Sequence, residues 1–115
     1  MNATAFEGLS IKDLVGIQNK IADSYEDIEK LKSFTDRTTA AKRIGKLLED
    51  TGERVIRLLK PEYVKRGKAA DRFPHYKDGM LASEYVSLCE EDGVDPTEAK
   101  RDIRYDNQLG LIRLV

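Results

Sequence analysis

The side chains with the clearest capacity to contact a ligand lie in a basic stretch around residue 42. Thr39, Lys42, Arg43 and Lys46 follow an i, i+3, i+4, i+7 pattern, so a helix would place them on one face, opposite its apolar residues. Lysine and arginine bind phosphates or base edges, and threonine hydrogen-bonds the DNA backbone. The four residues are therefore a candidate nucleic-acid-binding face. The alternative is an ordinary solvated basic face, which a charge pattern alone does not exclude.

A second basic stretch spans residues 60–79, where cations alternate with aromatic rings. Cations neutralise phosphates and rings stack on exposed bases, so this mixture suits a nucleic-acid backbone. It suits equally well a flexible tether whose Phe73 and Tyr76 dock onto a hydrophobic core. Two of the three prolines and two glycines fall here, which predicts a linker. Its candidate nucleic-acid-binding residues are Lys65, Arg66, Lys68 and Arg72.

The charge changes sign along the chain. Residues 54–77 contain eight basic and two acidic side chains, whereas residues 78–115 contain four and nine. Clustered carboxylates speed encounter with a basic protein surface and orient it, although their usual role is solubility. The candidate partner-binding residues of this acidic part are Glu84, Glu90, Glu91, Asp92 and Asp95.

The predicted last helix carries polar side chains of the kind that read bases, but acidic residues accompany them. Arginine, asparagine and glutamine make bidentate contacts with guanine and adenine edges. Asp102 and Asp106 are expected to repel phosphates, so this helix is predicted to pack or to bind a protein. Tyr105 and Leu109 are predicted core residues. The exposed set is expected to be Lys100, Arg101, Arg104, Asn107 and Gln108.

Catalysis, metal binding and cofactor binding are not expected. His75 is the only histidine and has no partner at a spacing that would form a nucleophile and base pair. Cys89, the only cysteine, falls on the inward face of a predicted helix, where a small buried hydrophobe is the usual role. We therefore predict a non-enzymatic protein with no catalytic residue, no metal and no cofactor.

The chain is expected to work in the cytoplasm without a membrane partner. No apolar run approaches the length of a membrane span. The first residues lack the basic and hydrophobic regions of a secretory signal peptide.

The helices that would position these side chains are predicted from their caps. Ser10, with a carboxylate three residues later, caps a helix whose apolar periodicity continues to Leu31, although Asp23-Ser24 could break it. Thr35 or Asp36 caps the next helix, which carries the basic face. Further helices are predicted over residues 81–91 and 96–108.

An internal repeat sets the predicted fold. Residues 39–58 and 97–114 share Thr, Ala, Lys, Arg and Gly at one constant offset, each followed by Ile-Arg-Leu. Each copy predicts a helix, a glycine stop and a short strand. We therefore predict a mostly α protein of two related helix-turn-helix, winged-helix-like units with minimal β wings. The expected divisions are a loose lead-in over 1–9, a first unit over 10–59, the basic linker over 60–79 and a second unit over 80–115.

Several segments resemble small uncharacterised proteins of bacteriophages and mobile elements. The likeness rests on residues 14–20, on the Phe-Thr-Asp-Arg-Thr-Thr-Ala-Ala-Lys-Arg run at 34–43, and on Gly79-Met80, Glu84-Tyr85 and residues 102–110. The resemblance implies a phage or prophage product in bacterial cytoplasm, and it carries no established activity. The leading hypothesis is a small phage-type regulatory protein that binds DNA through the first unit and the linker. The alternative is an inhibitor that binds a host protein, such as a defence nuclease, a CRISPR component or a transcription component.

Overall fold

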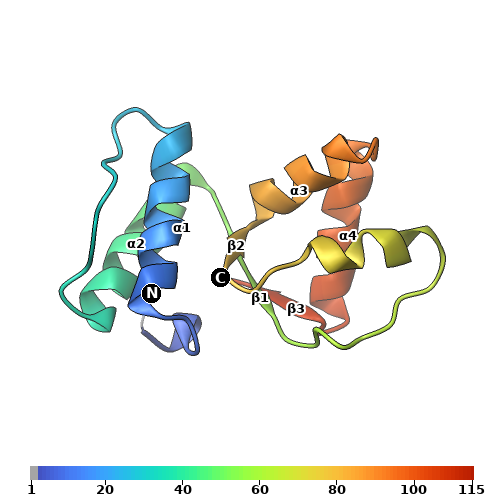
Figure 1. Cartoon of the computed structure of the whole chain (residues 1–115), viewed down its shortest axis with the longest axis horizontal. Helices are drawn as coiled ribbons and strands as arrows, with labels where there is room; N and C mark the ends of the chain where they lie inside the picture. The colour runs from blue at the N-terminus through green and yellow to red at the C-terminus, as the bar shows by residue number, and fades with distance from the viewer. Residues whose placement is uncertain (1–2) are drawn as a thin grey trace. The chain divides into compact units, whose positions relative to one another are not determined.

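The computed structural model describes residues 3–115, which form two units. The first unit reaches to Glu53 and the second spans Arg54–Val115 (Figure 1). Residues 60–79, expected to be a linker, belong to the second unit, where Phe73 and Tyr76 are buried. The docked interpretation of this stretch therefore agrees with the structure.

The first unit contains a short 3₁₀ helix and two α-helices whose predicted caps are confirmed. They are η1 (Ala3–Phe6), α1 (Ile11–Ser24) and α2 (Arg37–Thr51). The hydroxyl of Ser10 accepts from the N–H of Asp13, and the carboxylate of Asp13 accepts from the N–H of Ser10. Asp36 caps α2 by accepting from the N–H of Thr39 at 2.7 Å. Both caps satisfy backbone donors that the first turn of a helix leaves free.

The core of the first unit lies between α1 and α2, which contact each other along their apolar faces. The apolar face of α2, which the sequence places opposite the basic residues, is buried throughout, at Ala40, Ala41, Ile44, Leu47 and Leu48. The lead-in is not loose over its described part, because Phe6 and Leu9 are buried and the guanidinium of Arg37 donates to both of their carbonyls.

The first helix is shorter than its periodicity predicts, since it ends at Ser24. Two amide side chains of α1 hold the following loop in place. Gln18 Nε2 donates to the carbonyl of Glu29 at 2.8 Å, and Asn19 both donates to the carbonyl of Leu31 and accepts from its N–H. These bonds provide partners for backbone groups that a continued helix would have paired internally.

The second unit combines helices with a small antiparallel sheet. Its strands are β1 (Val55–Leu58), β2 (Met80–Leu81) and β3 (Ile112–Leu114), in the spatial order β2-β1-β3. Its helices are the 3₁₀ segments η2 (Gly67–Asp71) and η3 (Phe73–His75), and the α-helices α3 (Ala82–Glu91) and α4 (Pro96–Gln108). Buried residues of β1, η3, α3 and α4 share one core, which includes Ile56, Phe73, Tyr85, Ala99 and Ile103.

The predicted fold class is wrong, because the strands do not form two wings. The described chain is α+β, with all its strands in one sheet of the second unit. The two Ile-Arg-Leu triplets pair with each other, Ile56 opposite Leu114 and Leu58 opposite Ile112. Strands this short need partners to be stable, and the strand that follows α2 finds them in the second unit.

The repeat is real only as a local pattern. Gly52 and Gly110 both adopt a left-handed conformation, each with φ of 75°, after a helix and before a strand. However, α2 packs on α1 and η1, whereas α4 packs on α3 and β3. The two copies therefore share their helix stop, but they are not equivalent units.

We predict that Gly52→Ala destabilises the protein and that Gly16→Ala stabilises it. A Cβ at either position meets no atom within 4 Å, so packing contributes little. Alanine at Gly52 must adopt φ of 75°, which costs roughly 1–2 kcal/mol. Alanine at Gly16 instead removes the flexibility of glycine inside α1, which gains about 0.5–1 kcal/mol. Urea denaturation followed by circular dichroism measures both, and equal shifts of the same sign would contradict the assigned conformations.

We also predict that the caps of α1 and α2 make the stability depend on acid pH. Hydrogen bonds from backbone and side chain hold the pKa values of Asp13 and Asp36 below their ordinary 3.8. Because both folded-state pKa values are lowered, this stabilisation is complete above about pH 4 and is lost as the pH falls through them. Asn also caps helices, so Asp13→Asn/Asp36→Asn should flatten the fall in unfolding free energy below pH 4. An unchanged acid slope in this double variant would contradict the prediction.

Candidate nucleic-acid interface

Two buried aspartates of α4 organise the second unit. Asp95 caps this helix and Pro96 occupies its first turn, where a missing N–H has no consequence. Asp102 and Asp106 are four residues apart, so they lie on the same face as the buried Ala99 and Ile103. A carboxylate in this position needs a cation and hydrogen-bond donors, because burial of a lone charge is strongly unfavourable.

Arg72 provides the cation for Asp102. Its Nε and Nη2 atoms donate to the two carboxylate oxygens at 2.6 and 2.9 Å, a bidentate pair with both residues buried. The hydroxyl of Tyr85, from α3, donates to the same carboxylate at 3.0 Å. Hydrogen bonding to Asp102 raises the pKa of Arg72, and burial followed by the negative charge of Asp102 raises the pKa of Tyr85. The guanidinium is thus charged, and the phenol keeps its proton.

Lys65 and Tyr76 have the same roles at Asp106. The ammonium of Lys65, whose side chain is 8% exposed, pairs with Oδ1, and the hydroxyl of Tyr76 donates to Oδ2 at 2.7 Å. Burial, reinforced by the bond to Asp106, raises the pKa of Tyr76. Each aspartate therefore has one cation from the 60–79 segment and one tyrosine.

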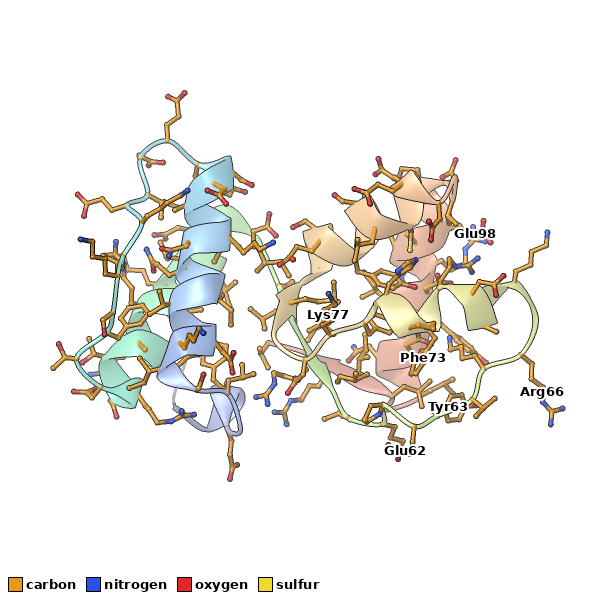
Figure 2. The ribbon with its side chains drawn as sticks, in the orientation of Figure 1. Glu62, Tyr63, Arg66, Phe73, Lys77 and Glu98 are labelled. Carbon is orange, nitrogen blue, oxygen red and sulfur yellow. The ribbon has the colours of Figure 1, made fainter. Side chains whose placement is uncertain are left out.

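Aromatic contacts connect the two ion pairs. The rings of Tyr76 and Tyr85 stack with centroids 4.2 Å apart and planes 10° apart. Phe73 contacts Tyr76 edge to face at 5.4 Å, and Tyr63 contacts Phe73 at 6.2 Å. Figure 2 shows Tyr63 beside Phe73. The segment that the sequence suggested as a linker is thereby attached to α4 at several points.

A groove of about 480 Å³ lies between this segment and α4. One wall comes from residues 63–72 and the other from α4, with Lys65, Arg72 and Asp102 among the lining side chains. Arg66 points away from the ribbon (Figure 2). The exposed lining residues include Tyr63, Val64, Arg66, Arg101, Tyr105 and Leu109. The volume falls in the range of small-molecule sites, but the groove is open and its lining is of mixed polarity.

The predicted nucleic-acid-binding residues separate into three groups. Thr39, Lys42, Arg43 and Lys46 lie exposed on α2, as the helical pattern predicts. Arg66 and Lys68 are exposed in the second unit. Lys65 and Arg72, in contrast, are held in the buried ion pairs, so their charges are already neutralised. The α2 residues belong to the first unit, and the residues of the 60–79 segment belong to the second.

The predicted partner-binding carboxylates surround α3, and several have local structural roles. Glu84 accepts from the N–H of Leu81 at the start of α3, and Asp95 caps α4. Asp92 Oδ2 lies 2.6 Å from His75 Nε2. Glu90 and Glu91 are exposed at the end of α3.

The sequence interpretation of α4 misplaced four of its residues. Tyr105 and Leu109 are 56% and 45% exposed rather than core, and Asp102 and Asp106 are buried rather than facing phosphates. The signal was available, because both aspartates share their helical face with an alanine and an isoleucine. This pattern alone does not predict burial, because carboxylates are rarely buried without a partner and the partners of these two come from a distant segment.

The remaining chemistry of the second unit is limited. Burial raises the pKa of the Cys89 thiol, which keeps it protonated and a poor nucleophile. Within residues 3–115, no group of three or more His, Cys, Asp or Glu side chains is placed to hold a metal ion.

Comparisons with known proteins identify no related protein. No protein family model, no curated protein and no solved structure matches the chain. In the part of the chain that the structure describes, no helix is both long and apolar enough to cross a membrane.

We predict that Asp102→Asn destabilises the protein far more than Asp23→Asn. Both aspartates pair with a cation, but Asp102 is buried together with Arg72, whereas the side chains of Asp23 and its partner Lys30 are 56% and 66% exposed. Removing one partner of a buried pair costs about 3–5 kcal/mol, and loss of an exposed pair costs about 1 kcal/mol or less. Urea denaturation of the full chain measures the difference. Similar losses in the two variants would show that burial of the Arg72 pair is not what makes it important.

Proposed function

We propose that the protein is a non-enzymatic regulator that binds nucleic acid through the exposed face of α4. One observation carries the proposal: both aspartates in the middle of this helix face inward and are paired with cations. Their charges therefore do not oppose the lysine and arginines on the outer face. The sequence alone assigns this helix to packing because its aspartates are expected to repel phosphates. With both aspartates buried, that reason no longer applies.

The outer face of α4 has the side chains that nucleic-acid recognition uses. Lys100, Arg101 and Arg104 are exposed and form no ion pair among the described residues. Asn107 and Gln108 are exposed on the last turn, where their amides could bind adenine edges. The cations would supply the affinity, and the amides and arginines the contacts to bases.

The exposed face of α2 is a second candidate surface for the same function. It presents Lys42, Arg43 and Lys46 to solvent. However, Arg43 and Lys46 line a hollow of about 270 Å³ together with Asp27 and Asp50. These carboxylates lower the positive potential at that end of α2, so we favour α4.

Inhibition of a host protein is the alternative function. Five acidic residues were predicted to bind such a protein. In the described structure Glu84 and Asp95 accept hydrogen bonds at helix starts and Asp92 pairs with His75, so Glu90 and Glu91 are the two that neither cap a helix nor form an ion pair. Two adjacent carboxylates at a helix end are a small docking surface, so this function has less support. The resemblance to phage proteins implies bacterial cytoplasm as the setting for either function.

We predict that Lys100→Gln/Arg101→Gln/Arg104→Gln weakens binding of labelled oligonucleotides and lowers its dependence on salt. Each phosphate contact that is lost releases about one fewer counterion, so the slope of log affinity against log salt should fall by about two to three for a duplex. Fluorescence anisotropy between 50 and 200 mM salt measures both quantities. The matched control is Lys42→Gln/Arg43→Gln/Lys46→Gln, which removes the same charge from α2.

The results of the two variants distinguish the exposed face of α4 from that of α2 as the nucleic-acid interface. A reduced slope only in the α2 variant would move the interface to α2 and leave the function in place. If the wild-type protein binds neither duplex nor single-stranded probes at 50 mM salt, the nucleic-acid proposal is wrong.

A further inference from the structure

The groove beside α4 collects the exposed apolar side chains of the second unit. Leu59, Tyr63, Val64, Tyr105 and Leu109 are the large hydrophobic residues that the described structure leaves exposed, and all but Leu59 line the groove. Exposed apolar side chains gathered in one place indicate a binding surface. Single apolar side chains scattered over a surface are common and would not indicate a binding surface.

The groove carries positive charge that is not paired internally. Its lining includes four cationic side chains, Lys65, Arg66, Arg72 and Arg101, and two anionic ones, Glu98 and Asp102. Lys65 and Arg72 are held in ion pairs, whereas Arg66 and Arg101 are exposed. These two guanidinium groups share the lining with the rings of Tyr63 and Tyr105, so the surface suits an anionic ligand that also has a flat apolar face.

We propose that this groove binds an unpaired base of single-stranded nucleic acid, which stacks on Tyr105, with Tyr63 as the second ring of the site. This inference rests on the proposed function and specifies its substrate class. Aromatic side chains combined with a cationic track are how proteins hold single strands, because every base has a π face and every nucleotide a phosphate. Bases inside a duplex are stacked on each other and cannot reach a ring in this position.

The polar part of the lining favours a base over an apolar peptide side chain. Arg66 and Arg101 contribute exposed guanidinium groups, and an apolar side chain placed on them would remove water without replacing its hydrogen bonds. The edge of a base and its phosphate offer acceptors that can replace that water. A nucleotide therefore matches both the rings and the arginines of the lining.

The groove exists before any ligand binds, because its two walls are fixed to each other. Lys65 connects residues 63–72 to Asp106, and Arg72 connects them to Asp102. The ammonium of Lys65 also lies 5.5 Å from the centroid of Tyr105, which supports this ring in its exposed position. A preformed site avoids the free energy of ordering its walls during binding.

The test compares three probes of twelve nucleotides by fluorescence anisotropy with the full chain: oligothymidylate, an abasic strand of the same length, and a duplex. The abasic strand keeps the phosphates and removes the bases. We expect oligothymidylate to bind about tenfold tighter than the abasic strand. Tyr105→Ala should remove about this tenfold on oligothymidylate, which corresponds to loss of one stacked base, and should change binding of the abasic strand less than twofold.

Two further variants control for folding and for general loss of apolar surface. Tyr105→Phe keeps the ring and should keep the affinity for oligothymidylate. Leu59→Ala truncates an exposed residue outside the groove and should have no effect. Since Tyr105 is 56% exposed, its truncation leaves the fold intact, which the thermal midpoint of the variant verifies.

Failure of this inference differs from failure of the proposed function. Equal binding of oligothymidylate and the abasic strand, or an unaffected Tyr105→Ala variant, would overturn the base site while salt-dependent binding still supports the function. Absence of binding to all three probes would overturn both and leave a protein ligand as the occupant of the groove.

Discussion

The second unit depends on the burial of two carboxylates in α4. Neither Asp102 nor Asp106 is tolerable there alone, so each requires a cation and a phenol from elsewhere in the chain. This requirement brings residues 60–79 onto α4, because Lys65, Arg72 and Tyr76 all come from that segment. A stretch with little regular structure thereby becomes a wall of the unit.

The same arrangement separates the charges of α4 onto opposite faces of the helix. Asp102 and Asp106 are turned into the unit and the three cationic side chains are left outside, although the helix as a sequence has three acidic and three basic residues. The surface potential of the helix therefore differs from the one that its composition suggests. Local net charge, counted along the chain, is a poor guide where carboxylates share a face with apolar residues.

The features that the sequence predicts are those set by residues close together in the chain. The caps at Ser10 and Asp36, the left-handed stop at Gly52 and the buried stripe of α2 depend on neighbours within four residues, and all were predicted correctly. The sheet was missed because β1 pairs with strands distant in sequence. The end of α1 was left open between Leu31 and the Asp23-Ser24 break, and the helix stops at the break. The sequence did not decide between them because Gln18 and Asn19 bind the following loop through side-chain amides, which leave no periodic pattern. The groove was missed because its walls are joined by long-range ion pairs.

The pairing of β1 with β3 also affects how the chain folds. Ile56 and Leu114 are far apart in sequence, so a long loop must close before the central strand acquires its second partner. The helices of the first unit pack on near neighbours in sequence and face a smaller entropic barrier. During folding, Val55–Leu58 exposes an apolar strand edge until β3 arrives, and such an edge is a site of association between chains. We therefore expect the second unit to fold more slowly than the first, and its unpaired strand edge to be the site at which chains associate when folding is interrupted.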